Sequence, residues 1–183
     1  MPTAIKIPTG TWTADPAHSS FGFSVKHLGI ATVRGTFDEF EGKIVLDGEL
    51  ADAKITGSAK AASINTSEPQ RDAHLQSADF FDAEQFPELT FESTSVTEVD
   101  EETFEITGNL TMHGVTKPIT LKAVLQGAET DPWGNDRVGF EITGQLDRSD
   151  WGMKFNQALG SGNLMVSDRV KLSLDISAVK QAA

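Results

Sequence analysis

The sequence predicts an all-β protein, built as a single antiparallel up-and-down β-barrel of about eight strands. Apolar and polar residues alternate in segment after segment, which is typical of half-buried strands. Turn-forming residues separate these segments at regular spacing, and no helical stretch is long enough to connect two parallel strands. A length of 183 residues suits one such domain. We expect a polar N-terminal arm over residues 1–10 and a single barrel domain over residues 11–179.

Four expected strands come first, at residues 10–15, 18–27, 33–46 and 53–63. The third of them changes the phase of its alternation near residues 38–39, from odd apolar positions to even ones. A β-bulge produces such a change, because it adds one residue that has no partner on the next strand. The fourth strand is rich in glycine and alanine, so the side chains on its inner face are small.

Strand periodicity stops over residues 64–87, where the sequence predicts a short helical excursion. Ser67 fits a helix N-cap, Pro69 fits the first turn, and Gln70 completes a capping box. Residues 82–85 repeat this pattern of a helix start.

The second half of the chain continues the barrel, with strands at residues 89–98, 104–112, 119–125, 137–147 and 170–178. A turn over residues 113–118 forms a hairpin from the second and third of these. Its Pro118 is expected only at the start of a strand or at a sheet edge, because proline has no N–H to donate. A second excursion, residues 148–168, contains the glycine-rich Gly160-Ser161-Gly162.

Connections between up-and-down strands alternate between the two ends of a barrel. Counted from the strand at 18–27, one end, which we call the long-loop end, carries residues 28–32, 64–87, 113–118 and 148–168. The other end, the short-turn end, carries residues 47–52, 100–102 and 129–136. Three of the four histidines fall at the long-loop end.

The charge of the chain excludes two kinds of partner. Fifteen Lys and Arg against 27 Asp and Glu give a net charge of −12. Such a surface repels phosphate backbones and anionic lipid headgroups, so we expect no nucleic-acid binding and no stable membrane insertion. The chain has no cysteine, and its first residues contain no apolar run of signal-peptide length, so we expect a cytoplasmic protein.

A metal site and a hydrolase triad are two further interpretations, and the residues support both of them less well. His27, His74 and His113, with Asp72 or Asp150, include enough ligands for zinc, but their spacing does not produce a compact site, and we expect no metal.

Asp15, His18 and Ser19 include the residue types of a hydrolase triad. Three such residues within one turn rarely reach nucleophile–base geometry, so we interpret them as turn-forming residues and assign no catalytic residue.

The inward faces combine phenylalanine with glycine and alanine. An eight-stranded barrel is about the size that either fills with side chains or holds one small ligand. Eleven Phe and no Tyr indicate an interior that stays apolar, since a buried Tyr hydroxyl would need a hydrogen-bond partner. On these residues alone, a filled core and a ligand cavity both remain open.

A family resemblance favours the cavity. The segment GNLTMHGVTKP (residues 108–118) resembles the G-x-L-T-h-H-G-V-T-[KR]-P signature of the YceI-like family of polyisoprenoid-binding proteins. Further matches are Asp15-x-x-His18-Ser19, Val33-Arg34-Gly35-x-Phe37, Arg71-Asp72-x-His74-Leu75 and Arg148-x-Asp150-Trp151-Gly152-Met153. The resemblance covers nearly the whole chain. It implies a lipocalin-like barrel whose interior binds a long isoprenoid chain, as in polyprenyl phosphates or isoprenoid quinones.

The resemblance implies a protein that binds, and carries or stores, an isoprenoid lipid, with no catalysis and no cofactor besides that lipid. The expected apolar lining is Phe21, Phe23, Phe37, Phe91, Phe104, Ile106, Leu110, Met112, Leu121, Phe140, Ile142, Leu172 and Leu174. The expected headgroup contacts are Arg71, His74, His113, Arg148 and Trp151; pairing of the two arginines with nearby aspartates is the structural alternative. Two other functions stay open: an enzyme using the His and Asp residues at the barrel mouth, and a filled barrel acting through protein contacts, for example as a homodimer.

Overall fold

The computed structural model describes residues 7–157, 159–161 and 165–182. Its strands are β1 (Gly10–Ala14), β2 (Ser20–His27), β3 (Ala31–Phe37), β4 (Phe40–Leu46), β5 (Lys54–Lys60), β6 (Ile64–Asn65), β7 (Glu88–Glu98), β8 (Thr103–Met112), β9 (Val115–Thr130), β10 (Asp136–Asp147) and β11 (Val166–Lys180). Its helical segments are α1 (Pro69–Gln76) and the 3-10 turns η1 (Leu50–Asp52), η2 (Ala61–Ser63) and η3 (Arg148–Trp151).

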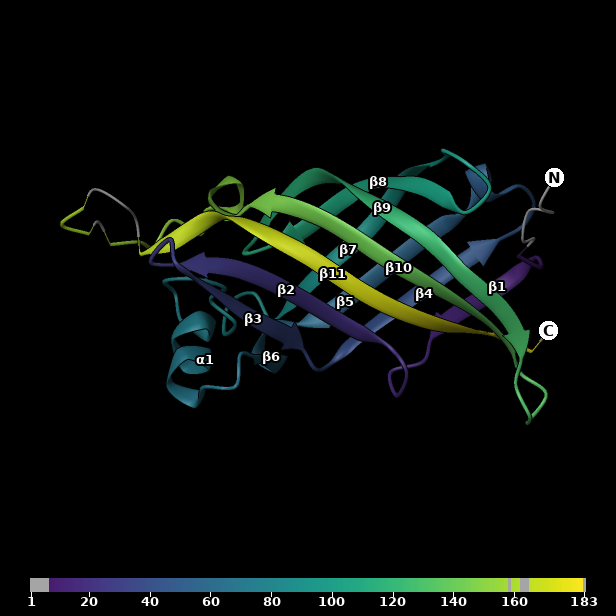
Figure 1. Cartoon of the computed structure of the whole chain (residues 1–183), viewed down its shortest axis with the longest axis horizontal. Helices are drawn as coiled ribbons and strands as arrows, with labels where there is room; N and C mark the ends of the chain where they lie inside the picture. Colours follow the sequence, from purple (N-terminus) through teal and green to yellow (C-terminus); the bar gives the residue numbers. More distant parts are fainter. Residues whose placement is uncertain (1–6, 158, 162–164, 183) are drawn as a thin grey trace.

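One sheet contains all of these strands, in the order β1-β4-β5-β7-β8-β9-β10-β11-β2-β3-β6, and a further β1–β11 pairing closes it (Figure 1). Every pairing between neighbouring strands is antiparallel. The predicted all-β, lipocalin-like antiparallel barrel is therefore confirmed.

The wall consists of eight staves, where a stave is one strand or two successive strands lying along one line. β1 and β2 share a stave, because both pair with β11. β3 and β4 share the next one, since β4 pairs with β1 and β3 pairs with β2. β5 and β6 share the third, against β4 and β3 respectively. The remaining five staves are β7 to β11, so the prediction of about eight strands is confirmed.

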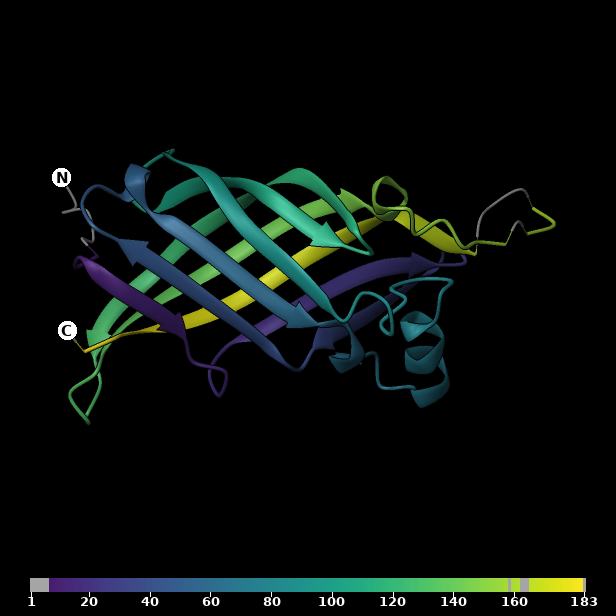
Figure 2. The same cartoon turned by 180° about the vertical axis from the view of Figure 1, so that it is seen from behind.

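Three staves are therefore interrupted. Near residues 38–39 the sequence predicted a β-bulge within one long strand, but the stave is broken there into β3 and β4. The break at residues 15–19 was not predicted: we expected two separate strands joined by an ordinary turn, but β1 and β2 run in the same direction along β11 (Figure 2).

The β8–β9 hairpin has a tighter turn than the sequence predicted. His113 and Gly114 have φ values of 54° and 72°, as a two-residue type I′ turn requires. The expected turn over residues 113–118 is therefore too long, because β9 begins at Val115. Pro118 pairs with Asn109 of β8, in a part of β9 that precedes its pairs with β10, so the missing N–H removes no hydrogen bond from the sheet.

The excursion over residues 64–87 contains α1, with a different cap from the one predicted. The Glu68 carboxylate accepts hydrogen bonds from the backbone N–H groups of Gln70 (3.2 Å) and Arg71 (2.7 Å), so Glu68 and not Ser67 is the N-cap. A carboxylate there satisfies two donors at once and opposes the positive end of the helix dipole. Residues 82–85 form a turn and no helix, and Asp82 has a φ of 49°.

The second excursion begins with η3, and β11 starts at Val166, earlier than the expected residue 170. Gly162 of the glycine-rich segment, like residues 1–6 of the N-terminal arm, lies outside the described residues. The predicted division into ends is correct: α1, η3 and the β2–β3 turn gather at the left in Figure 1, whereas β1 begins and β11 ends at the right.

The core consists of two apolar clusters. One lies toward the short-turn end and includes Trp12, Leu46 and Val138, and the other lies toward the long-loop end and includes Ile64, Trp151 and Met153. All six side chains are at most 4% exposed. Each end of the barrel is therefore filled by side chains.

Candidate functional site: an apolar cavity in the barrel

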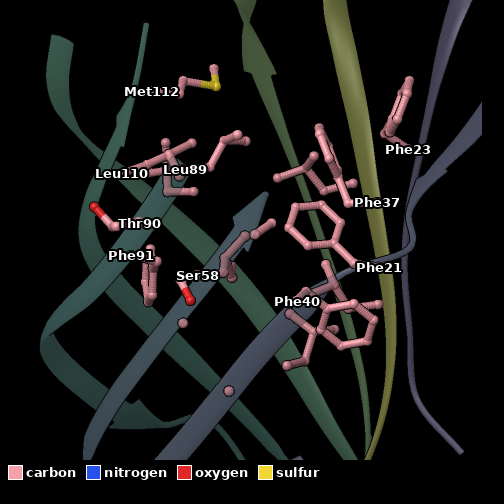
Figure 3. Close-up of a pocket in the computed structure, with 18 of the residues that line it drawn as sticks. Phe21, Phe23, Phe37, Phe40, Ser58, Leu89, Thr90, Phe91, Leu110 and Met112 are labelled. Carbon is pink, nitrogen blue, oxygen red and sulfur yellow. The ribbon is translucent and has the colours of Figure 1, made fainter. Parts of the chain in front are cut away.

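A cavity of about 230 Å³ lies inside the barrel, between and beside these two clusters. Typical ligand pockets measure about 300–1,000 Å³, so this one is slightly smaller. All thirteen residues predicted to form an apolar lining border it: Phe21, Phe23, Phe37, Phe91, Phe104, Ile106, Leu110, Met112, Leu121, Phe140, Ile142, Leu172 and Leu174. Figure 3 shows several of them converging from opposite walls. Their contact with a ligand stays a prediction.

Aromatic side chains shape one side of the cavity. Phe37 lies at the centre, with ring centroids 5.1 Å from Phe21, 5.6 Å from Phe23 and 5.6 Å from Phe81. The Phe21 and Phe81 contacts are edge-to-face, which aromatic rings prefer over flat stacking. These rings form a continuous apolar wall next to the break between β3 and β4.

The free space around individual glycines shows where the barrel interior could accept a larger side chain. Gly42 and Gly57 face each other across β4 and β5, and a β-carbon added to either would meet nothing closer than 3.5 Å. At Gly108, by contrast, it would lie 2.5 Å from both the Phe91 ring and the Glu92 carbonyl oxygen. Gly42 and Gly57 therefore leave space, whereas Gly108 accommodates a packed ring.

Sequence reasoning missed several lining residues at the long-loop end. Leu75, Phe80 and Phe81, in the excursion over residues 64–87, border the cavity, and so does Met153. The alternation that identifies inward positions does not exist outside strands, so only their apolar character could have indicated them.

Arg148 is the one predicted headgroup residue that borders the cavity. Its side chain is buried and donates to three backbone carbonyl oxygens, those of Met153 (2.8 Å), Ser167 (3.0 Å) and Val166 (3.3 Å). Its guanidinium also lies 5.7 Å from the centre of the Phe80 ring. Burial lowers the pKa of Arg148 from its usual value, and the charge of Asp168 opposes that shift.

The other four predicted headgroup residues bond to the protein itself. Arg71 donates to the Thr66 carbonyl oxygen (2.6 Å) and hydroxyl (2.8 Å), and His74 Nε2 lies 2.8 Å from an Asp79 carboxylate oxygen. Trp151 Nε1 donates to the Leu110 carbonyl oxygen (2.9 Å).

His113 Nδ1 lies 2.9 Å from the Trp151 carbonyl oxygen, to which it donates. The bonds of Trp151 and His113 join the second excursion to the barrel, whereas those of Arg71 and His74 are made within the excursion over residues 64–87. A role in headgroup recognition stays a prediction for all five residues.

The metal and hydrolase interpretations find no supporting geometry. Among residues 7–157, 159–161 and 165–182, no group of three or more His, Cys, Asp or Glu side chains converges as metal ligands do. Ser19 Oγ bonds to the backbone of Ser177, accepting from its N–H (3.0 Å), and so is engaged by β11.

Asp15 belongs to a charged cluster around Arg137. Arg137 donates to Asp15 (2.9 Å) and to Asp131 (2.8 Å). These hydrogen bonds are the main cause that lowers the pKa of each carboxyl from 3.8 to about 2, and His18 adds to the effect at Asp15. The cluster ties the β1–β2 connection to the β9–β10 turn.

An eight-stave antiparallel barrel around an apolar cavity has the architecture of a lipocalin-like barrel. No helix in the described part of the chain is long and apolar enough to cross a membrane. The YceI-like domain family matches residues 12–178, and the chain belongs to that family.

Relatives of known sequence support this assignment. A UPF0312 protein of Pseudomonas putida is 40% identical over 165 residues, which are 90% of this chain and 82% of that protein. A UPF0312 protein of Vibrio parahaemolyticus is 37% identical over 97% of this chain and 94% of its own length.

Three solved structures share the fold. The Campylobacter jejuni YCEI protein is 32% identical, with a TM-score of 0.73 over 86% of this chain and 90% of its own. BcnA of Burkholderia cenocepacia has a TM-score of 0.78 at 19% identity, over 90% of this chain and 98% of its own. A polyisoprenoid binding domain from Saccharophagus degradans has a TM-score of 0.72 at 16% identity, over 93% and 98%. The last two show the fold alone.

Proposed function

We propose that this protein binds an isoprenoid lipid, with the apolar tail in the barrel cavity, and that it carries or stores that lipid without chemical change. The observation that carries the proposal is the cavity itself: side chains fill both ends of the barrel, yet space remains among phenylalanine, leucine and isoleucine side chains. The polyisoprenoid binding domain of Saccharophagus degradans, which has the same fold, supports the choice of ligand.

The energetics of burial favour an apolar tail over water. Burial of one methylene contributes about 0.8 kcal/mol, so one five-carbon prenyl unit contributes about 4 kcal/mol. Water would find few polar partners on these walls, and an apolar cavity of this kind stays dry unless a ligand fills it.

Mass spectrometry of lipids extracted from the purified protein tests the proposal. We expect an isoprenoid in extracts of the unmodified protein and much less in the Gly57→Leu variant, whose new side chain projects into the cavity. Gly127→Leu is the matched control, because Gly127 does not border the cavity and has open space around it. An unmodified protein that retains no isoprenoid, or equal amounts in the two variants, would contradict the proposal.

A further inference from the structure

The side of the barrel wall has a stretch without backbone pairing between the first stave and the second, which we call the side opening. The β1–β4 ladder ends at the pair Thr13–Lys43, and the β2–β3 ladder begins at the pair Gly22–Thr36. Between these pairs, residues 14–21 and residues 37–42 face each other with no pairing.

Backbone groups at the edges of this opening bond away from it. The Asp15 N–H donates to the Ser177 carbonyl oxygen on β11 (2.8 Å), and the Asp38 N–H donates to the Ser63 carbonyl oxygen (3.0 Å). The Glu39 carbonyl oxygen accepts from the Lys60 N–H (2.9 Å). The neighbouring staves thus hold each edge in place, and the opening is part of the fold.

The cavity and a groove on the outer face lie on either side of this part of the wall. A groove of about 800 Å³ runs over the outer face of the barrel, and it shares Ala14, Phe40, Gly42 and Gly57 with the cavity. Phe21 and Phe40 flank the opening, with ring centroids 6.4 Å apart, and both are only half-buried (Figure 3). At the long-loop end, Phe80, Trp151 and Met153 are almost fully buried, and Leu75 and Phe81, which also border the cavity, are half-buried.

Most residues along the outer groove have polar side chains, and they carry little positive charge. Its neutral polar side chains are Thr13, Thr56, Ser58, Thr90, Asn109, Thr111 and Thr116. Its charged side chains are Glu41, Glu92 and Lys43, which leave a net negative charge. A phosphate would be repelled there, whereas a neutral group that carries hydroxyl or carbonyl oxygens finds hydrogen-bond partners.

We propose that the ligand enters the barrel through this side opening and that its polar end is then bound in the outer groove, with the tail in the cavity. The groove selects a neutral, oxygen-bearing head group over a phosphate. This inference rests on the proposed lipid-binding function and adds the path of the ligand and the chemistry of its head group. It places the head group at the side of the barrel and away from the predicted residues at the long-loop end.

A reversible staple across the opening tests the path. A β-carbon on Gly42 would lie 3.5 Å from the Ala14 Cβ, within the range of about 3.5–4.5 Å found in disulfides. The chain has no other cysteine, so the double variant Ala14→Cys/Gly42→Cys forms one defined bridge. We measure uptake and release of farnesol by the oxidised and the reduced forms of this variant.

We expect the oxidised form to take up and release farnesol at least tenfold more slowly than the same protein after reduction. Equal rates in the two forms would overturn the side path. A wild-type protein that takes up no farnesol overturns the proposed function itself and the side path with it, so the two failures are distinguishable.

Head-group selection is tested with two ligands of identical tail. Farnesol should bind at least tenfold more tightly than farnesyl phosphate, and Glu41→Lys should reduce that ratio several-fold. Glu105→Lys is the matched control, because it makes the same charge change on the exposed face of β8, outside the groove. Preferential binding of the phosphate by the wild-type protein, or equal effects of the two substitutions, would overturn the assignment of the groove.

Discussion

Filling the cavity with a side chain should stabilise the ligand-free protein while it weakens ligand binding. Gly57 is the position for this change, since the nearest atom to an added β-carbon is the Glu41 carbonyl oxygen at 3.5 Å. Replacement of a strand glycine removes a backbone entropy cost of about 0.5–1 kcal/mol. Burial of a leucine side chain contributes about 1.5–3 kcal/mol and costs about 0.5–1 kcal/mol in lost rotamer freedom.

These terms give Gly57→Leu a net stabilisation of about 2 kcal/mol in lipid-free protein. For a chain of this length, that corresponds to a rise in Tm of about 4–8 °C. The assay is urea unfolding of delipidated protein, in which an unchanged m-value shows that the change acts on stability.

Gly108→Ala is the opposing control on a nearby stave. The added carbon would lie 2.5 Å from the Glu92 carbonyl oxygen and from the Phe91 ring, so we expect a loss of about 1–3 kcal/mol from overpacking. Destabilisation of the lipid-free protein by Gly57→Leu, or a neutral Gly108→Ala, would refute the reasoning that space lies at the first glycine and not at the second.

Three further predictions concern the bonds that hold the loops to the barrel. Arg137→Gln should reduce the free energy of unfolding at pH 6. Because its two carboxylate partners have pKa values of about 2 instead of 3.8, the difference between variant and wild type should shrink as pH falls from 4 to 2. A difference that persists in urea titrations at pH 2 would contradict the ion-pair origin. Arg148→Met should cost about 2 kcal/mol in the same assay, since the Met153 and Ser167 carbonyl oxygens lose this donor, whereas that of Val166 keeps the Asn156 amide (2.7 Å). A cost below 1 kcal/mol would show that these bonds are easily replaced. Glu68→Ala should cost about 1 kcal/mol through loss of the α1 cap, whereas Ser67→Ala should leave the free energy of unfolding unchanged. A larger loss for Ser67→Ala than for Glu68→Ala would show that Ser67 is the N-cap.

The sequence predicted which side chains of each strand face the barrel interior, because successive side chains of a strand point to opposite faces of the sheet. A residue such as Phe104 or Ile142 faces inward whatever its neighbours are, once its segment alternates and one face is apolar. The same logic located the break near residues 38–39, where the phase changes. It did not reveal the break at residues 15–19, because a turn within a stave and a turn between two strands have the same local sequence, and only the pairing with β11 distinguishes them.

The excursions and the headgroup residues were harder to predict for a different reason. The type of a side chain indicates which bonds it can make, but not which partner it finds. Trp151 and His113 bond to backbone carbonyl oxygens that come from segments close only in the folded protein. Similarly, Glu68 replaces Ser67 as cap because of the backbone conformation at Ser67, whose φ is 64°.

The closure of the barrel by β11 has a consequence for how the chain is made. β11 pairs with β1, β2 and β10, and thus with strands from both ends of the sequence. During synthesis β11 is the last of these strands to leave the ribosome. Until it emerges, the stave of β1 and β2 and the stave of β10 each have an unpaired edge, and phenylalanine side chains stay exposed. Such long-range pairings fold slowly, and the nascent chain is most prone to aggregation in this interval. A truncation that removes β11 should therefore yield an insoluble product and not a smaller barrel.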